Sequence, residues 1–285
     1  MAGSEYRDAS RDQWGGAAEH WADVAEKPDT GASAHAAAWM LEAAALEPGE
    51  RVLEVACGAG RVGLQAAEIV GDDGVVVCSD FAEPMVDAVR TRAERHGLTN
   101  VEPRVLDAEQ MSFENAERFD AVLCRMGYML MSDPLTALNR SREALLPGGR
   151  LALAVWGTAE ENPWLAEVFN VVMAQLGAPP PPEGTPGPFA LGDPDRVRAL
   201  LEEAGFDEVG VERLEIDQTY ESPSGWWDEI LGLGGPLAAL LGSMSEADAG
   251  AVRTAALERA KAYEAGDGSV CFPAVAIAAR ATGGS

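Results

Sequence analysis

The sequence predicts an α/β fold in which helices cover both faces of a mostly parallel sheet. Two observations support this prediction. Short runs rich in Val, Leu and Ala alternate with segments of helical spacing between residues 51 and 156, which is typical of a parallel sheet buried on both faces. Two later strand-like segments, separated by a helical stretch, indicate an antiparallel addition at one edge of that sheet.

The elements of the first half are expected in a regular order. One or two short helices precede Pro28, and an alanine-rich helix covers 31–46. Strands are expected at 51–56, 74–79, 101–106, 119–124 and 150–156, with helices at 61–70, 83–96 and 134–145. Right-handed crossovers would wind these strands into a doubly wound sheet.

The C-terminal part is organised differently. The stretch 178–189 is rich in proline, which gives a stiff, extended backbone typical of a connector. Around it, helices are expected at 162–176 and 193–204, strands at 209–220 and 270–280, and a helical region at 224–263. We therefore expect an N-terminal helical cap (1–46), a core (47–157), a cap insertion with the proline-rich loop (158–190), and the end of the sheet (191–285) with a helical insertion at 221–268.

Charge and cysteine usage narrow the class of protein. The chain has 21 basic and 47 acidic residues and a net charge of −26, so it would repel a phosphate backbone and no nucleic-acid partner is expected. The four cysteines contain no CxxC pair, so neither a metal site nor a disulfide framework is expected. The N-terminus has no apolar leader and no stretch approaches a membrane span, which predicts a cytoplasmic protein. Abundant Ala, Gly and Arg with two lysines are typical of a GC-rich bacterial genome.

The segment 52–63, VLEVACGAGRVG, is the most informative part of the chain. A strand ends at Ala56, and Gly58 and Gly60 allow the backbone to turn and to approach a ligand closely. The helix that follows offers free N–H groups and a partial positive charge. Asp80 ends the next strand, where a carboxylate can accept hydrogen bonds from both hydroxyls of a ribose. This combination predicts an adenosine-containing cofactor.

Two kinds of cofactor fit such a loop. The spacing Gly58-x-Gly60-x-x-Gly63 matches the dinucleotide fingerprint, so a nicotinamide-dependent oxidoreductase is one alternative. Glu54 argues against it, because a carboxylate inside the first strand is unfavourable near a pyrophosphate. The same carboxylate can orient the amino-acid end of a zwitterionic cofactor.

Five motifs in order resemble those of the class I S-adenosylmethionine-dependent methyltransferases, closest to the ubiquinone/menaquinone-biosynthesis-like subgroup (methyltransferase type 11). VLEVACGAG resembles the first motif, SDFAEPMVDAV the second-strand motif and RVLDAEQMSF the segment that holds adenine. FDAVLCRMGYMLMSDP resembles the fourth-strand motif, and ALLPGGRLALAVW the turn and strand that follow. The resemblance covers residues 50–156 and continues more weakly to the C-terminus. It implies a Rossmann-like, mostly parallel seven-stranded sheet with an antiparallel edge strand and helical cap insertions.

The resemblance also implies S-adenosylmethionine as the cofactor, S-adenosylhomocysteine as its product, and a role for each motif residue. Asp80 would hold the ribose hydroxyls, with Phe81 and Met85 near adenine. Asp107 would accept from the adenine amino group and Ala108 would donate through its backbone, with Glu109 beside them. The residues expected around the methionine part and the ribose are Glu54, Ala56, Cys57, Gly58 and Gly60, and Arg125 would offer its carbonyl to the cofactor's amino group. The family usually has glycine where this chain has Ala56.

Methyl transfer requires the protein to align the acceptor and, where needed, to remove a proton. The candidate catalytic residues are His35, at the start of the second helix, and Tyr128, just beyond the fourth strand; His20 is a further histidine that could face the methyl group. Large apolar residues at strand ends and in insertions either line an apolar substrate pocket or anchor the insertions to the core. They are Trp14, Trp21, Met126, Met129, Trp156, Trp164, Trp226 and Trp227.

The sequence therefore predicts S-adenosylmethionine-dependent methyl transfer to a small, largely apolar or aromatic metabolite, such as a secondary metabolite, a quinone or a lipid-like molecule. Two alternatives stay open. One is a protein of the same fold that catalyses a non-methylating reaction such as cyclisation, and the other is an NAD-dependent oxidoreductase. The accepting atom is left open, as is the oligomeric state, for which a homodimer is one option.

Overall fold

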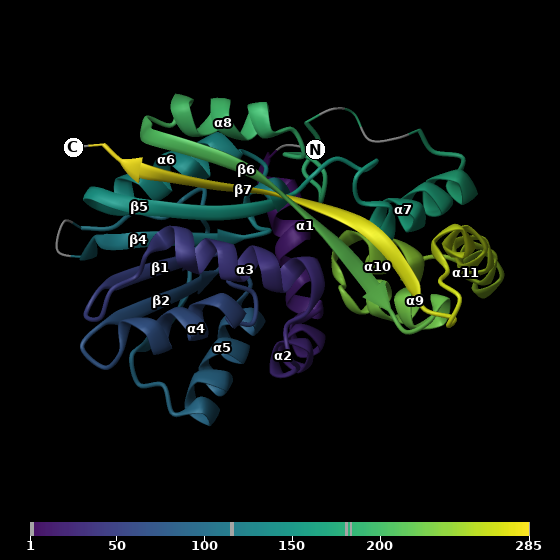
Figure 1. The fold of residues 1–285 in the computed structure, drawn as a ribbon, viewed down its shortest axis with the longest axis horizontal. Helices are drawn as coiled ribbons and strands as arrows, with labels where there is room; N and C mark the ends of the chain where they lie inside the picture. Colours follow the sequence, from purple (N-terminus) through teal and green to yellow (C-terminus); the bar gives the residue numbers. More distant parts are fainter. Residues whose placement is uncertain (1–2, 115–116, 180–181, 183, 285) are drawn as a thin grey trace.

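A seven-stranded sheet with the order β3-β2-β1-β4-β5-β7-β6 forms the centre of the protein (Figure 1). The computed structural model describes residues 3–114, 117–179, 182 and 184–284; residues 180, 181 and 183 of the expected proline-rich connector lie outside the described residues. The strands are β1 (Arg51–Val55), β2 (Val75–Asp80), β3 (Val101–Val105), β4 (Phe119–Arg125), β5 (Leu145–Trp156), β6 (Phe206–Tyr220) and β7 (Val270–Gly283).

The first five strands are parallel, and β7 runs antiparallel to both β5 and β6. The predicted mostly parallel, doubly wound sheet is therefore confirmed. In detail, the antiparallel strand β7 lies one place in from the edge, because β6 pairs along its outer side. The chain builds β1, β2 and β3 outwards and then returns to place β4 on the other side of β1. This reversal creates a switch point at the carboxyl ends of β1 and β4, where open α/β sheets bind ligands.

Alternate residues of the strands pack into two different layers. Val52, Val76 and Leu123 face a layer formed by α3 (Gly31–Ala44), α4 (Arg61–Val70) and α5 (Glu83–His96). Their neighbours along the strands, such as Leu53, Val77 and Val122, face the layer that contains α6 (Pro134–Ala144) and α8 (Pro194–Glu203). The buried side of α3 is almost entirely alanine, which lets this helix lie close to the strands.

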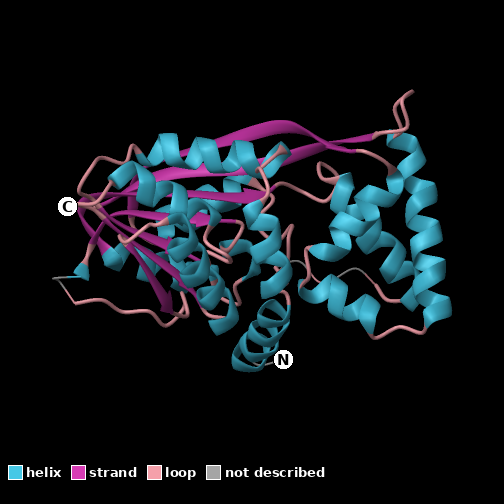
Figure 2. Ribbon diagram, turned by 90° about the horizontal axis from the view of Figure 1, so that it is seen from below, coloured by secondary structure: helices cyan, strands magenta, loops and turns pink. Residues whose placement is uncertain are grey.

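A helical lobe stands beside the sheet, as Figure 2 shows. It contains α7 (Pro163–Leu176), α9 (Pro223–Gly232), α10 (Gly235–Gly242) and α11 (Glu246–Ala260). The predicted helical stretch 224–263 is thus divided, because Gly234 has a φ of +68° and Ser245 caps the start of α11. The long β6–β7 pair runs from the sheet into this lobe (Figure 1).

Two further helices, α1 (Gly3–Gly16) and α2 (Ala18–Glu26), form an N-terminal cap that contacts both α5 and α10. The cap therefore bridges the sheet domain and the helical lobe. Among the described helices, none combines the length and the apolar character needed to cross a membrane.

Candidate functional site

The loop between β1 and α4 has a backbone that turns through left-handed conformations. The φ angles of Ala56, Gly58 and Gly60 are +51°, +53° and +75°. A Cβ built on Gly60 would lie 3.0 Å from a methyl of Val89, so glycine there allows α5 to approach the loop. A Cβ on Gly58 would have no described atom within 4 Å, which leaves open space above this part of the loop.

Asp80 fastens this loop to the end of β2. Its side chain is buried, with the residue 6% exposed. Its Oδ2 accepts a hydrogen bond from the backbone N–H of Gly58, and its Oδ1 from that of Ala82, each at 3.0 Å. Burial raises the pKa of Asp80 to about 6. Because a carboxylate can accept about four hydrogen bonds, both oxygens keep capacity for the hydroxyls of a ribose.

Glu54 lies beneath the loop rather than in it. Its Oε2 accepts a hydrogen bond of 2.8 Å from the backbone N–H of Gly63, in the first turn of α4. A Cβ on Gly63 would collide with Glu54 Oε2 and with Cys78 Sγ. The third glycine of the spacing is therefore explained by the packing of α4 on Glu54, and it no longer supports a dinucleotide site. Burial raises the pKa of Glu54 to about 8, and the positive charge of Arg125 opposes this rise.

Arg125 ends β4 at the switch point, and its side chain turns towards the start of α3. Its Nη1 donates to Asp29 Oδ2 at 2.8 Å and to Ser33 Oγ at 2.9 Å. The next residue, Met126, has a φ of +58°, so the chain turns sharply away from the strand. The family resemblance implies a role for the Arg125 carbonyl alone, whereas the guanidinium also holds the linker between α2 and α3.

Asp107 and Glu109 follow β3 and are joined to the N-terminal cap. Asp107 Oδ1 accepts from the backbone N–H of Glu109 at 2.9 Å, and Glu109 Oε1 accepts from that of Ser132, also at 2.9 Å. Arg7 of α1 lies 3.0 Å from Glu109 Oε2 and 3.5 Å from Asp107 Oδ2. Both carboxylates thus bind protein groups, and Glu109 holds α1 in place.

The side chains expected near adenine lie under the cap. Met85 is buried beside Ala82 and Ala18, and Phe81, Trp14 and Trp21 pack against that group. The ring centroids of Trp14 and Trp21 are 6.3 Å apart. The cap therefore covers the end of β2, next to Asp80.

A buried arginine that sequence reasoning missed joins the cap to the loop. Arg92 of α5 donates to the carbonyl of Ala59 in the loop at 2.5 Å and to the carbonyl of Ala25 in α2 at 2.9 Å. Its Nε also donates to Glu26 at 2.9 Å. On helix spacing alone, Arg92 is indistinguishable from a solvated surface charge, so the sequence carries no signal for this role.

The geometry argues against both catalytic candidates. Tyr128 is 1% exposed, and its hydroxyl shares a hydrogen bond of 2.6 Å with Ser141 Oγ in the core. Burial also raises its pKa well above the usual value. His35 is exposed on the side of α3 that faces away from the sheet, and its Nδ1 lies 3.0 Å from the carbonyl of Gly31. Neither side chain is placed to reach a ligand above the loop.

Most of the large apolar candidates act as anchors of the helical lobe. The rings of Trp156 and Trp164 meet edge to face at 5.0 Å, and Trp226 Nε1 donates to the Trp164 carbonyl at 2.7 Å. Met129 Sδ accepts from the backbone N–H of Trp156 at 3.4 Å. Trp227 is buried at the edge of a hollow described below. This placement favours the anchoring interpretation for these side chains.

Trp21 joins the cap to the helical lobe through its indole N–H, which donates to the Leu233 carbonyl at 2.8 Å. Trp14 and Met126 are half-buried, at the cap and at the end of β4 respectively. Of the expected substrate-contacting residues, Trp14 and Trp21 are therefore the ones placed on the cap itself.

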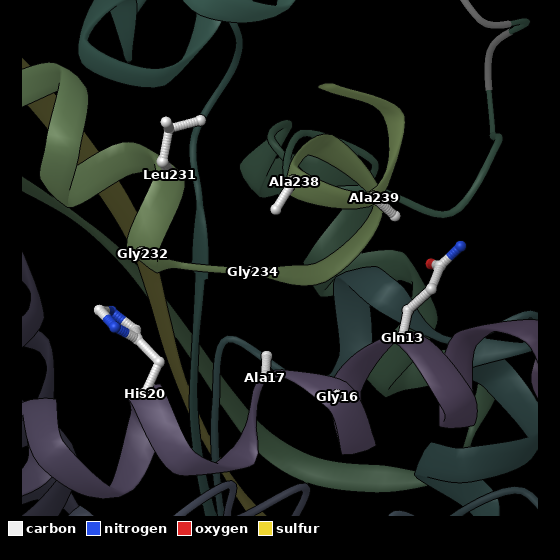
Figure 3. A pocket seen from close by; sticks show the side chains of 9 residues that line it. All are labelled: Gln13, Gly16, Ala17, His20, Leu231, Gly232, Gly234, Ala238 and Ala239. Carbon is white, nitrogen blue, oxygen red and sulfur yellow. The ribbon is translucent and has the colours of Figure 1, made fainter. Parts of the chain in front are cut away.

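Two adjoining hollows lie on the helical lobe, and the first of them is where the lobe meets the cap. The first, of about 390 Å³, is bounded by Gln13, Gly16, Ala17 and His20 of the cap. On its other side it is bounded by Leu231, Gly232, Gly234, Ala238 and Ala239 (Figure 3). The second, of about 470 Å³, lies between α9, α10 and α11 and shares Leu231 and Ala238 with the first. In the described part of the chain, no group of three or more metal-ligating side chains was found.

Comparisons with known proteins agree with this geometry. The sequence profile of the family described as "Methyltransferase domain" matches residues 46–205. Nocamycin O-methyltransferase of Saccharothrix syringae is 32% identical over 65% of this chain and 68% of its own length. The ubiquinone/menaquinone biosynthesis C-methyltransferase UbiE of Ectopseudomonas mendocina is 34% identical over 64% of this chain and 70% of its own length. Aklanonic acid methyltransferase DauC of a Streptomyces strain is 39% identical over 36% of this chain, and the match spans 47% of that relative.

Solved structures share the fold at lower sequence identity. The YcgJ protein of Bacillus subtilis superimposes with a TM-score of 0.58 at 17% identity, over 88% of this chain and 99% of its own. The [4+2]-cyclase SpnF superimposes with a TM-score of 0.55 at 21% identity, over 87% of this chain and 80% of its own. These two likenesses concern the fold alone.

Proposed function

We propose that this chain, which belongs to the methyltransferase family and uses S-adenosylmethionine as its methyl donor, methylates a small, largely apolar or aromatic metabolite. The names of its relatives support an acceptor of this class, since they refer to nocamycin, to aklanonic acid and to ubiquinone and menaquinone biosynthesis. The net charge of −26 further supports a small-molecule acceptor over a nucleic acid.

The observation that carries this proposal is the attachment of Asp80 to Gly58. The carboxylate fixes the loop and retains acceptor capacity, and the space above Gly58 is open. This acceptor capacity suits the hydroxyls of the cofactor's ribose, with the start of α4 near the cofactor's charged groups. Phe81 and Met85 would contact adenine, and Asp107 would accept from its amino group. Cys57 and Ala108 would contribute backbone groups to the same site.

The cofactor, when bound, supplies a methyl group that is already activated by the sulfonium. The residues of this chain therefore have to bind the cofactor and the acceptor, orient them relative to each other, and exclude water. Arg92 and Arg125 hold the cap and its linker against the loop, so the cap would cover the reacting groups. Glu54 holds the first turn of α4 in place beside the loop, because its side chain accepts the hydrogen bond from Gly63 N–H.

We place the acceptor in the first hollow, between the cap and the helical lobe. Like His35, His20 is exposed, but its ring lines this hollow and lies against Gly232. Where the acceptor must lose a proton, we propose His20 for that role in place of His35 and Tyr128. We also propose the expected division of the chain into cap, core, cap insertion and sheet end. A cytoplasmic location and a homodimeric state are part of the same proposal.

The test is a turnover assay with methyl-labelled S-adenosylmethionine and a panel of hydroxylated naphthoquinones and phenols. We expect labelled product and S-adenosylhomocysteine to form in a ratio of one to one. Because the fold is shared with a cyclase, the cyclisation alternative predicts a changed acceptor without S-adenosylhomocysteine. The oxidoreductase alternative predicts turnover that requires NAD.

A further inference from the structure

Helix α1 of the N-terminal cap bridges the two segments that are proposed to hold adenine. A Cβ added to Gly15 of this helix would lie 3.6 Å from a proline ring in the segment 81–85. Arg7 of the same helix reaches the segment 107–109, where its Nη1 lies 3.0 Å from a carboxylate oxygen of Glu109. An adenine between the two segments would therefore lie beneath α1.

The end of the cap that leads into α3 is firmly attached to the sheet domain. Three arginines, Arg61, Arg92 and Arg125, donate hydrogen bonds to the segment 24–29. Their acceptors are backbone carbonyls at the end of α2, which lack partners within the helix, and two carboxylates. Charge-assisted hydrogen bonds of this kind are the stronger ones in proteins, so this end of the cap is the fixed one.

The free end of the cap is attached by two side chains near the start of α1. Tyr6 Oη donates to the Leu130 carbonyl at 3.0 Å. Arg7 Nη1 donates to Glu109 Oε2 at 3.0 Å and lies 3.4 Å from Ser132 Oγ. The Arg7 side chain is 24% exposed, so water can take the place of its partners when the contact breaks. This end can therefore detach more readily than the segment 24–29.

Residues proposed to contact the cofactor are covered by the cap. Met85, expected near adenine, is 2% exposed and packs in one cluster with Ala18, Trp14 and Trp21 of the cap. Asp80, expected at the ribose, is also buried. A cofactor that arrives from solvent cannot contact side chains covered to this degree until the covering helices move.

We propose that the N-terminal cap is a lid over the cofactor site, which pivots about the segment 24–29 and is latched at its free end by Tyr6 and Arg7. The cofactor enters and its product leaves while the latch is open. This inference rests on the proposed function, because it assumes the cofactor position given there. Opening also breaks the hydrogen bond from Trp21 to Leu233, which the variants used below retain.

A latch affects rates and affinity differently. Tyr6 and Arg7 stabilise the closed cap both in the free protein and in the protein with cofactor bound. Their contribution therefore cancels in the equilibrium affinity, whereas the fraction of open protein sets the rates of entry and release. A fixed wall that contacts the cofactor would instead change the affinity through the dissociation rate.

The experiment measures the exchange rates of S-adenosylhomocysteine on the chain of 285 residues. Association is followed by stopped-flow tryptophan fluorescence, and dissociation by chasing labelled S-adenosylhomocysteine with an excess of the unlabelled compound. In Arg7→Gln both rates should rise about tenfold, because a charge-assisted contact is lost. The dissociation constant should stay within about twofold of wild type. Tyr6→Phe loses one neutral hydrogen bond, and both of its rates should rise about threefold.

Arg90→Gln is the matched control for Arg7→Gln. It removes the same charge from α5, where the guanidinium pairs with Asp87 of its own helix, and both of its rates should equal those of wild type. The proposal is overturned if Arg7→Gln and Tyr6→Phe exchange the ligand at the wild-type rates, or if Arg90→Gln exchanges it as fast as Arg7→Gln. It is also overturned if dissociation alone becomes faster and affinity falls in proportion.

Two further comparisons keep the outcomes distinct. Because Arg7 also lies 3.5 Å from Asp107, Tyr6→Phe tests the latch through a contact with the Leu130 carbonyl instead. Tight binding of S-adenosylhomocysteine with equal rates in all variants refutes the lid alone. Absence of binding in the wild-type protein refutes the proposed function as well.

Discussion

The methyl group of Ala56 fills the space that Gly127 leaves free. A Cβ built on Gly127 would lie 2.7 Å from the Cβ of Ala56 and 2.7 Å from Cys124 Sγ. Ala56 itself has a φ of +51°, a conformation that favours glycine. Alanine at this place in the loop after β1 is thus accommodated by glycine in the loop after β4.

This contact predicts a coupled effect of two substitutions. Gly127→Ala should lower the free energy of unfolding by about 1–3 kcal/mol, because the added methyl collides with Ala56 and Cys124. Removing the Ala56 methyl should recover part of that loss, so a double-mutant cycle with Ala56→Gly should give a coupling energy of at least about 0.5 kcal/mol. Urea unfolding of the four proteins measures it, and strictly additive effects would show that the two loops do not touch.

Arg92 is expected to hold the N-terminal cap. Arg92→Leu removes the hydrogen bonds to the carbonyls of Ala59 and Ala25 and to Glu26, and should lower the free energy of unfolding by about 2–4 kcal/mol. Hydrogen exchange of residues 18–26 should rise at the same time. Arg90→Leu is the control, since the Arg90 side chain is 52% exposed on the same helix and its loss should change stability by no more than about 0.5 kcal/mol. Equal effects of the two substitutions would contradict this role.

Glu54 should make stability depend on pH. Its folded pKa is about 8, whereas the ordinary value is 4.5, and burial is the main cause. The folded chain therefore holds the proton over a pH range in which the unfolded chain has released it. The contribution of Glu54 to the free energy of unfolding is therefore fully present below pH 4.5, and it is lost as the pH rises towards 8.

Glu54→Gln keeps an acceptor for Gly63 N–H but does not titrate. Its stability relative to wild type should therefore improve steadily between pH 5 and pH 8.5, by up to about 1.4 kcal/mol for each difference of one in pKa. The pKa of Asp80 is also raised, to about 6. Because Asp80 is present in both proteins, its contribution to the pH dependence cancels in the comparison. Parallel stability curves for the two proteins would indicate that Glu54 is ionised throughout this range.

Substitution of the histidines and of Tyr128 should separate the catalytic candidates. Tyr128→Phe removes the hydrogen bond to Ser141 and should lower stability by about 1 kcal/mol, while kcat stays within about twofold of wild type. His35→Ala should also leave kcat unchanged, because His35 faces away from the sheet. His20→Ala should lower kcat by about 10²-fold if proton removal limits the reaction. A large loss of kcat in Tyr128→Phe at unchanged stability would reverse this assignment.

Local patterns explain which features could be predicted from the sequence. The strands and helices of the core follow from periodicity, and the loop at 56–60 with Asp80 follows from turn chemistry at the ends of adjacent parallel strands. The role of Arg7 depends on a contact with Glu109, which is 102 positions away, and no local spacing links the two. Tyr128 illustrates a second limit. It follows β4 as expected, but it lies in a short 3₁₀ turn that points its side chain into the core, and spacing along the chain does not give that direction.

The most direct test of the cofactor site is the affinity of Asp80→Ala for S-adenosylhomocysteine, measured by calorimetry at pH 7.5 beside wild type and Asp87→Ala. Asp87 lies on α5 with an exposed side chain, so its loss is a matched control for charge. We expect Asp80→Ala, folded by circular dichroism, to bind at least about tenfold more weakly, because it loses charge-assisted hydrogen bonds to the ribose. Asp87→Ala should bind like wild type. An unchanged affinity in Asp80→Ala would show that the cofactor does not bind on the loop that Asp80 holds.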